Sequence, residues 1–132
     1  MNNTAHRRIA LRLAMHSGPC SIPVDRIQHL AGYATLSGKA DDYFRGWLTY
    51  QGRQVPVFDL NRVLCDEPTP ERFGSRIMLL ETPDSAPTRS IGLLAPGITD
   101  TVAAGDSACS PVDLDSYLPM LCSMIPTPVP SV

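Results

Sequence analysis

The chain has 132 residues, of which 43% are hydrophobic and 18% charged, and its net charge at pH 7 is −2. This composition is typical of one globular domain and excludes a disordered chain. It gives no reason to expect nucleic acid as a partner, because the phosphate backbone selects basic surfaces. Thirteen prolines and nine glycines lie between short apolar runs, which favours many short strands over long helices.

The first third of the chain alternates short strands with turns. Residues 1–8 are polar and are expected to form a flexible arm. Alternating apolar residues predict a strand over 9–15, and a second strand at 20–22 makes a hairpin with it. Pro23 opens residues 24–30, which fit either a short helix or an extended segment. Residues 31–42 contain glycine, serine and paired aspartates and are expected to be a loop.

The centre of the chain, residues 44–60, has the pattern of a β-hairpin. Two apolar runs meet at Gln51-Gly52, and Gly52 can supply the positive φ of a tight turn. With these two residues as the loop, the predicted facing pairs are Gly46 with Val57, Trp47 with Pro56, and Leu48 with Val55.

Two residues of the second run restrict its surroundings. Pro56 cannot donate a ladder hydrogen bond, so its strand is expected at an edge or with Pro56 in a non-bonded position. Asp59 is expected to cap a brief helical turn that follows it.

The last part of the chain continues the pattern of short strands. A linker is expected over 66–74 and a loop over 103–113, residues 114–125 are ambiguous, and 126–132 form a proline-rich tail. Strands are predicted at 76–81, 90–95 and 98–102. The predicted fold class is therefore all-β, a barrel or sandwich, with one domain over 9–125.

Candidate chemistry is sparse. No G-x-S-x-G nucleophile motif and no phosphate-binding glycine loop is present, and His16 with Cys20 has metal-ligand types but no recognisable spacing. We therefore predict a non-enzymatic protein without catalytic residues, cofactor or metal.

The four cysteines and the apolar runs bear on location. The cysteines lack C-x-x-C pairs, and the sequence shows no signal peptide and no apolar stretch of bilayer-spanning length. We expect a reduced, cytoplasmic chain without direct membrane insertion. The cysteines are Cys20, Cys65, Cys109 and Cys122.

Interface-type residues gather around the hairpin. Arginine and large aromatic residues are enriched in protein-interface hot spots, although Trp47 and Tyr50 fit a core equally well. The set is Arg45, Arg53 and Arg62 with Trp47, Tyr50 and Phe58.

Residues 44–60, Phe-Arg-Gly-Trp-Leu-Thr-Tyr-Gln-Gly-Arg-Gln-Val-Pro-Val-Phe-Asp-Leu, resemble the signature of CheW-like chemotaxis coupling domains. The strands at 76–80 and 91–102 are similar to that family's later strands, and the likeness covers about 9–103. The resemblance implies two intertwined, five-stranded SH3-like barrels. It also implies an adaptor that bridges a CheA-type histidine kinase to the cytoplasmic tips of methyl-accepting chemoreceptors.

The resemblance also implies partner-binding positions. Ile27, Gly46, Gln51 and Arg53 match positions at or near the family's receptor-facing groove. Gln51 departs from the family, which has an arginine there and often pairs it with a glutamate at the position of His29. We expect a hydrogen bond between His29 and Gln51 to replace that charged pair.

A further departure lies near the C-terminus, where the family's closing strands are shortened or missing. Either residues 121–125 form a makeshift closing strand, or one barrel has an open edge that invites self-association. Two alternatives to coupling stay open. One is a degenerate CheW-like or other small β-barrel protein-binding module that lacks receptor and kinase coupling, and the other is an enzyme with an unrecognised site.

Overall fold

The computed structural model describes residues 9–32, 34, 36–38, 40, 41, 43–70, 74–82, 89–103 and 105–126. The predicted arm (1–8) and the tail from residue 127 lie outside the described residues, so the domain boundaries stay a prediction. The elements are β1 (Ile9–Met15), β2 (Gly18–Pro23), the 3-10 turn η2 (Val24–Arg26), β3 (Ile27–Gly32), β4 (Phe44–Tyr50), β5 (Arg53–Asp59), α1 (Leu60–Cys65), β6 (Arg76–Thr82), β7 (Arg89–Ala95), β8 (Ile98–Ala103), β9 (Ser110–Pro111) and α2 (Leu114–Ser123).

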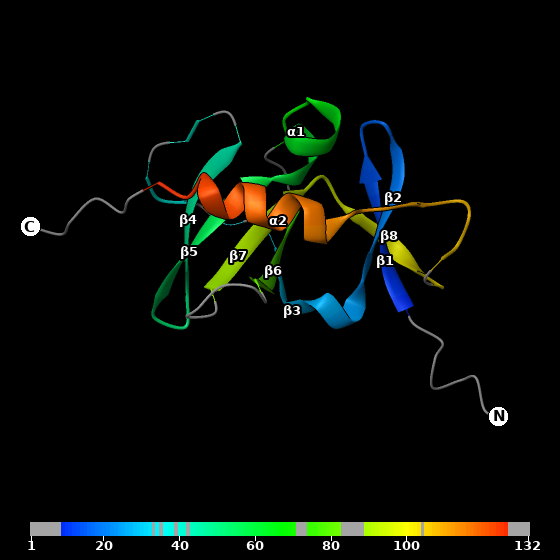
Figure 1. Cartoon of the computed structure of the whole chain (residues 1–132), viewed down its shortest axis with the longest axis horizontal. Helices are drawn as coiled ribbons and strands as arrows, with labels where there is room; N and C mark the ends of the chain where they lie inside the picture. The colour runs from blue at the N-terminus through cyan, green and yellow to red at the C-terminus, as the bar shows by residue number, and fades with distance from the viewer. Residues whose placement is uncertain are drawn as a thin grey trace, which may run out of the picture.

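The strands form two sheets at opposite ends of the molecule (Figure 1). A four-stranded sheet has the order β8-β1-β2-β9, and a five-stranded sheet has the order β3-β6-β7-β5-β4. Segments from both halves of the chain meet in each sheet, which confirms the predicted all-β, two-unit architecture. Within the described residues, no backbone ladder closes either sheet into a complete barrel.

The five-stranded sheet curls around a small core of its own. Its two edge strands, β3 and β4, both contribute side chains to this core, and the His29 and Tyr50 rings meet across the seam with centroids 4.7 Å apart. The sheet is therefore barrel-like, joined at the seam by side chains. The buried residues of this inner core are Leu48, Val55, Val57, Ile77, Leu79 and Leu94.

A larger core lies between the two sheets and beneath α2. It combines Leu13 and Ile22 of the four-stranded sheet with Phe58 and Leu93 of the five-stranded sheet, all at most 1% exposed. Neighbouring residues of β6 enter different cores, Met78 and Leu80 the larger and Ile77 and Leu79 the smaller. Strand β6 is thus covered on both faces, which agrees with its near-continuous apolar sequence.

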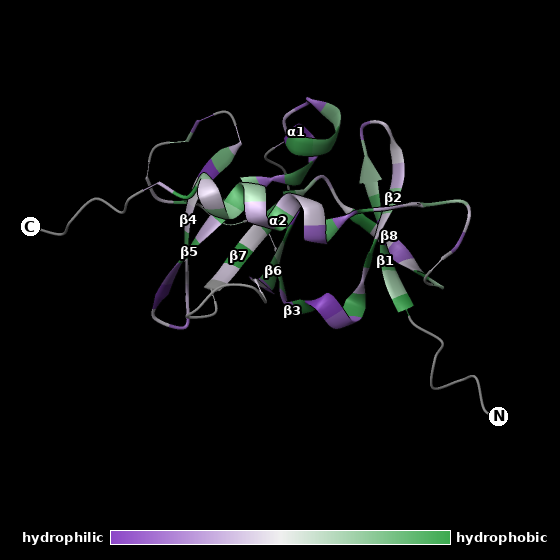
Figure 2. Cartoon of the chain, in the orientation of Figure 1, coloured by the Kyte–Doolittle hydropathy of each residue, from purple (hydrophilic) through white to green (hydrophobic). Residues whose placement is uncertain are grey.

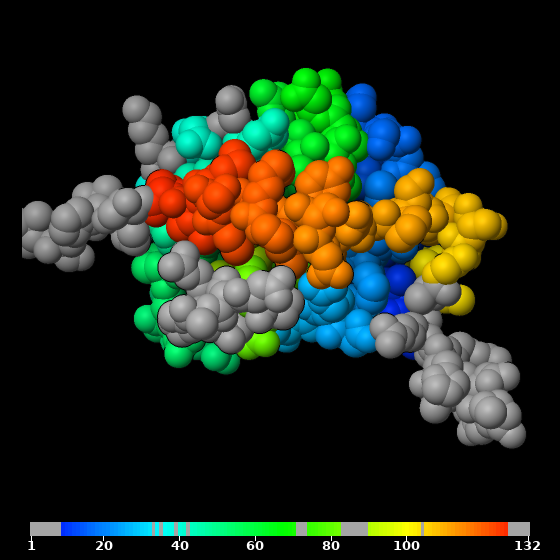
Figure 3. All heavy atoms as spheres, viewed as in Figure 1, coloured from blue at the N-terminus to red at the C-terminus, as the bar shows by residue number. Residues whose placement is uncertain are grey.

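Helix α2 lies across the face of the molecule between the two sheets, with its outer side uncovered (Figures 1 and 3). Leu114, Leu118 and Leu121 fall on one helical face and are buried, while the outward face mixes polar and apolar residues (Figure 2). Asp113 caps the helix by accepting from the Ser116 backbone N–H at 3.4 Å, and it also accepts from the Ser116 hydroxyl at 2.7 Å. The makeshift closing strand over 121–125 is therefore wrong, because leucines at i, i+4 and i+7 suit a helix that covers an apolar core.

The stability of α2 depends on burial. Its interior contains Pro119, which costs about 3 kcal/mol by removing a hydrogen bond and crowding the preceding turn. Three buried leucines contribute roughly 2 kcal/mol each. The helix is therefore held by the larger core and has little stability of its own.

The segment after Pro23 realises both of its predicted forms. Residues 24–26 make a 3-10 turn and residues 27–32 continue as strand β3, which pairs with β6. From Ile27 onward the backbone is extended because it pairs with β6.

Candidate partner-binding surface

The β4–β5 hairpin has the predicted register. Gly46 faces Val57, Trp47 faces Pro56 and Leu48 faces Val55. The turn residues Gln51 and Gly52 have φ values of 51° and 77°, as a two-residue type I′ turn requires.

Pro56 lies in an inner strand but in a non-bonded position, so the edge alternative is wrong for β5. Its facing residue Trp47 turns its backbone N–H and C=O away, toward Ser37, at 2.7 and 2.9 Å. The parallel ladder with β7 begins only at Val57. No partner strand therefore needs a Pro56 N–H.

The aromatic residues of the hairpin are mostly interior. Phe58 is fully buried, and Phe44 packs edge-on against it and against Trp47, which is half-buried. Phe58 therefore belongs to the core and is excluded from a contact surface.

Gly46 sits in a tight place below the hairpin surface. Its φ is +131°, and a Cβ there would lie 2.8 Å from both the Leu36 Cβ and the Ser37 carbonyl oxygen. A register shift between Phe44 and Gly46 leaves Arg45 unmatched as a bulge residue. Gly46 is buried, so it can affect a partner only through the shape of the hairpin.

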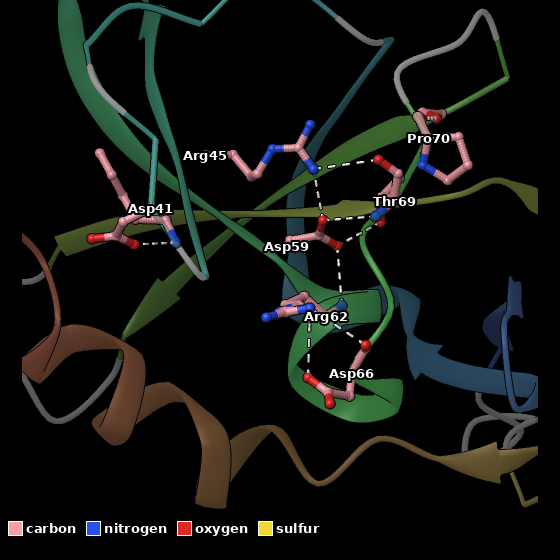
Figure 4. Close-up of polar contacts among 9 residues, drawn as sticks. Asp41, Arg45, Asp59, Arg62, Asp66, Thr69 and Pro70 are labelled. Carbon is pink, nitrogen blue, oxygen red and sulfur yellow. Dashed lines mark hydrogen bonds and ion pairs between the residues drawn. The ribbon is translucent and has the colours of Figure 1, made fainter.

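The bulge aims Arg45 at the buried Asp59 carboxylate (Figure 4). Asp59 is 1% exposed and accepts from the Arg45 guanidinium at 2.7 Å, the Thr69 backbone N–H at 2.7 Å, the Thr69 hydroxyl at 2.6 Å and the Arg62 backbone N–H at 3.2 Å. The last bond is the predicted cap of α1. One carboxylate thus fastens β4, α1 and the segment around Thr69 to the end of β5.

An open pocket of about 390 Å³ lies beside this carboxylate. Its charged lining residues are already engaged, since Arg45 pairs with Asp59 and Arg62 with Asp66 at 3.6 Å. These pairs indicate a structural role for the group. The lining residues are Ala40, Asp41, Arg45, Asp59, Arg62, Pro68 and Thr69.

The hairpin turn is the exposed end of this region. Gln51 and Arg53 are exposed there, and the ring of His29 lies against Tyr50, the residue before Gln51. No hydrogen bond joins the His29 and Gln51 side chains among the contacts of the described residues. His29 therefore approaches the turn through a tilted ring contact with Tyr50, with 34° between the ring planes.

Ile27 lies apart from the turn. It begins β3, faces Leu80 of β6 and packs half-buried against the larger core. The structure thus gathers His29, Gln51 and Arg53 at one end of the five-stranded sheet and leaves Ile27 and Gly46 elsewhere.

Outside the hairpin, one ion pair and one thiol have pKa values that their surroundings shift. The Arg12 guanidinium donates to both Asp100 carboxylate oxygens and thereby lowers the pKa of Asp100, while Asp100 raises that of Arg12. Burial raises the pKa of the Cys20 thiol, which disfavours the reactive thiolate.

The residues that the structure describes contain no group of three or more metal-ligating side chains that could hold a metal ion. They also include no helix of membrane-spanning length and hydropathy.

The hairpin and its flanking strands match a known domain family. The model of the CheW-like domain matches residues 10–117. The chain belongs to the CheW-like domain family. A search of curated proteins finds no match.

Among solved structures, the CheW-like chain is similar to the scaffolding protein TtCheW from Thermoanaerobacter tengcongensis. The superposition has a TM-score of 0.64 at 12% sequence identity and covers 76% of this chain and 64% of the other. At this identity the likeness establishes the fold. The chain spans less than two thirds of that relative's length.

Sequence reasoning missed the contribution of Thr69 to the site. It lies between Pro68 and Pro70 in a segment that reads only as a linker. The one local signal at Asp59 is its place at a helix start, where an aspartate accepts hydrogen bonds from nearby N–H groups. This signal does not identify Thr69 as a donor.

Proposed function

We propose that this CheW-like chain is a non-enzymatic adaptor that couples chemoreceptors to a CheA-type histidine kinase. The observation that carries the proposal is the family match, which runs through the hairpin whose turn is exposed. A coupling protein needs complementary surfaces and no reacting groups. In this proposal the chain acts in the cytoplasm, at the receptor tips.

We place the receptor contact at the hairpin turn. Exposed Arg53 and Gln51 make direct contacts, and buried Gly46 sets the shape of the hairpin that carries them. Ile27, half-buried at the start of β3, extends the contact beyond the turn. The tilted ring contact between His29 and Tyr50 supports the turn from β3. Gly46→Asp should abolish coupling, because it puts a charge into a strand that has no room for a Cβ.

Co-sedimentation of the purified chain with receptor-containing membranes and kinase tests the proposal. Arg53→Ala should weaken the complex by about tenfold if Arg53 is a hot-spot contact. The matched control is Gln54→Ala, which removes the neighbouring exposed side chain on the other face of β5 and should change binding less than about twofold.

The alternative is a protein-binding module of the same fold that has lost coupling. Gln51, at the family's arginine position, favours it. A chain that is folded yet sediments with neither receptor nor kinase would refute the adaptor proposal and support this module. Self-association through an open sheet edge is a separate proposal about partners, supported by the outer side of β8, with which no described strand pairs.

A further inference from the structure

Strand β8 ends the four-stranded sheet on the side away from the five-stranded sheet (Figure 1). Its inner side pairs with β1, and among the described residues no strand pairs with its outer side. At the opposite end of this sheet, β2 is covered by β9 and by a hydrogen bond from the Val112 N–H to the Ser21 carbonyl at 3.0 Å. The two ends therefore differ: the edge strand β9 has two residues, one of them Pro111, whereas β8 offers six residues to a further strand.

The prolines of β2 reveal which β8 backbone groups face outward. In β1, Ala10 faces Pro23 and Ala14 faces Pro19. Both are non-bonded pairs, because proline has no N–H to exchange. The backbone groups of Ala10, Arg12 and Ala14 therefore point toward β8, and the Ala14 N–H indeed donates to the Gly97 carbonyl at 3.1 Å.

It follows that Asp100 and Val102, which face Arg12 and Ala10, direct their backbone groups toward β1. Thr101 lies between them and directs its N–H and C=O to the open side. The Ala103 carbonyl also faces outward, but it accepts from the Asp106 N–H at 3.1 Å. Thr101 is thus the centre of the free edge.

The strand has the composition of one that pairs readily. Ile98, Thr99, Thr101 and Val102 are β-branched, and neither proline nor lysine interrupts the strand. A bulge at Thr99 interrupts the regular pairing with β1 only near the beginning of β8. The Arg12 guanidinium neutralises the Asp100 charge across the inner ladder.

We propose that β8 pairs antiparallel with β8 of a second copy of this chain, about a twofold axis through Thr101. In this register Thr101 exchanges both backbone hydrogen bonds with Thr101 of the second copy. Asp100 faces Val102 and Thr99 faces Ala103, so no two like charges are opposed. The two four-stranded sheets join into one continuous sheet.

The register favours a second copy over an unrelated strand. A twofold contact requires a surface patch that is complementary to itself. In the Thr101-centred register the outward backbone groups of the two Thr101 residues bond to each other, and no two like charges face each other, so β8 meets this requirement. The overlap is short, so the dimer should be weak and depend on concentration. The proposal does not rest on the receptor–kinase role.

Sedimentation velocity over a concentration series tests the pairing. Thr101→Pro removes the outward N–H and leaves the bonds to β1 intact, so it should weaken the dimer by about tenfold or more. Thr101→Val is the matched control: it keeps the N–H and the branched shape and should change the dimer constant less than about twofold. A wild-type chain that stays monomeric throughout, or a Thr101→Pro variant that dimerises normally, overturns the proposal.

Amide hydrogen exchange in the unmodified protein gives a test that needs no variant. The Val102 amide, bonded to β1, should be protected at every concentration. The Thr101 amide should exchange quickly in dilute protein and become protected as the dimer forms. Dimerisation without added protection at Thr101 would assign the interface to another surface and refute this one.

Discussion

The five-stranded sheet and the four-stranded sheet share the larger core but are stabilised in different ways. The five-stranded sheet has a second core of its own, a seam between its edge strands and a buried carboxylate that fastens three segments. The four-stranded sheet has one buried side, a cover formed by α2, an exposed Arg12–Asp100 pair and an edge at β8 with which no described strand pairs. The family-like hairpin therefore lies on the half of the fold that is specified by more interactions.

The two halves contain equivalent features that can be compared directly. Each has a helix capped by aspartate and a glycine with φ near +130° in a strand. Substituting the matched residues and comparing the losses of stability measures how differently the two halves are stabilised.

The largest effect is expected at the two capping aspartates. Asp59→Ala removes the acceptor of four hydrogen bonds and leaves Arg45, whose side chain is only 13% exposed, without its carboxylate. We expect a loss of about 3–5 kcal/mol in the free energy of unfolding. Asp113→Ala, at the exposed cap of α2, should cost about 1 kcal/mol. Urea denaturation measures both, and equal losses would contradict the distinction between the halves.

Substitutions at the two strand glycines separate the cost of a steric clash from the cost of backbone strain. Gly46 and Gly18 have φ values of +131° and +127°, but only Gly46 has atoms within 4 Å of a would-be Cβ. Gly46→Ala should therefore cost about 3 kcal/mol or more from strain and overlap together, and Gly18→Ala about 1–2 kcal/mol from backbone strain alone. The difference between their thermal denaturation midpoints gives the contribution of the tight contact with Leu36 and Ser37. A difference near zero would mean that the 36–37 segment yields easily.

Helix α2, which covers the larger core, is expected to unfold locally. Leu118→Ala empties a buried position of α2 and should cost about 2–3 kcal/mol. Its control, Met120→Ala, alters a side chain that is 40% exposed on the same helix and should cost less than about 0.5 kcal/mol. Amide exchange should then accelerate in α2 and hardly change in β6 and β7. Uniform acceleration throughout the chain would indicate that α2 and the five-stranded sheet unfold together.

The smallest effect concerns the exposed Arg12–Asp100 pair. Because Arg12 lowers the pKa of Asp100 in the folded state, the pair stabilises the fold above the unfolded pKa of Asp100. That contribution is lost as the pH falls below about 4. Stability of Asp100→Asn should thus fall slightly less steeply than wild type between about pH 5 and pH 2. Parallel pH profiles would show that the pair is screened by solvent.

Prediction from sequence succeeded where the determining interactions are local. The hairpin register from Gly46 to Val57 follows from a two-residue turn and the alternation of adjacent strands. The cap at Asp59 follows from the preference of helix starts for short polar acceptors. Both depend on residues close together in the chain.

The features missed from sequence depend on residues brought together by folding. Thr69 reaches Asp59, and His29 reaches Tyr50, only after the five-stranded sheet has curled. The 114–125 segment was ambiguous because Pro119 and poor helix formers obscure its spaced leucines, and the larger core decides in favour of the helix.

The sequence by itself determined the all-β class, the hairpin, the likeness to CheW-like domains and the absence of recognisable catalytic motifs, because these rest on short-range patterns of residues. Only the tertiary structure decided that Phe58 is interior, that Gly46 is confined, that α2 covers the larger core and that no described strand pairs with the outer side of β8. Burial and strand order depend on which distant segments pack together, and packing is selected by the free energy of the whole chain.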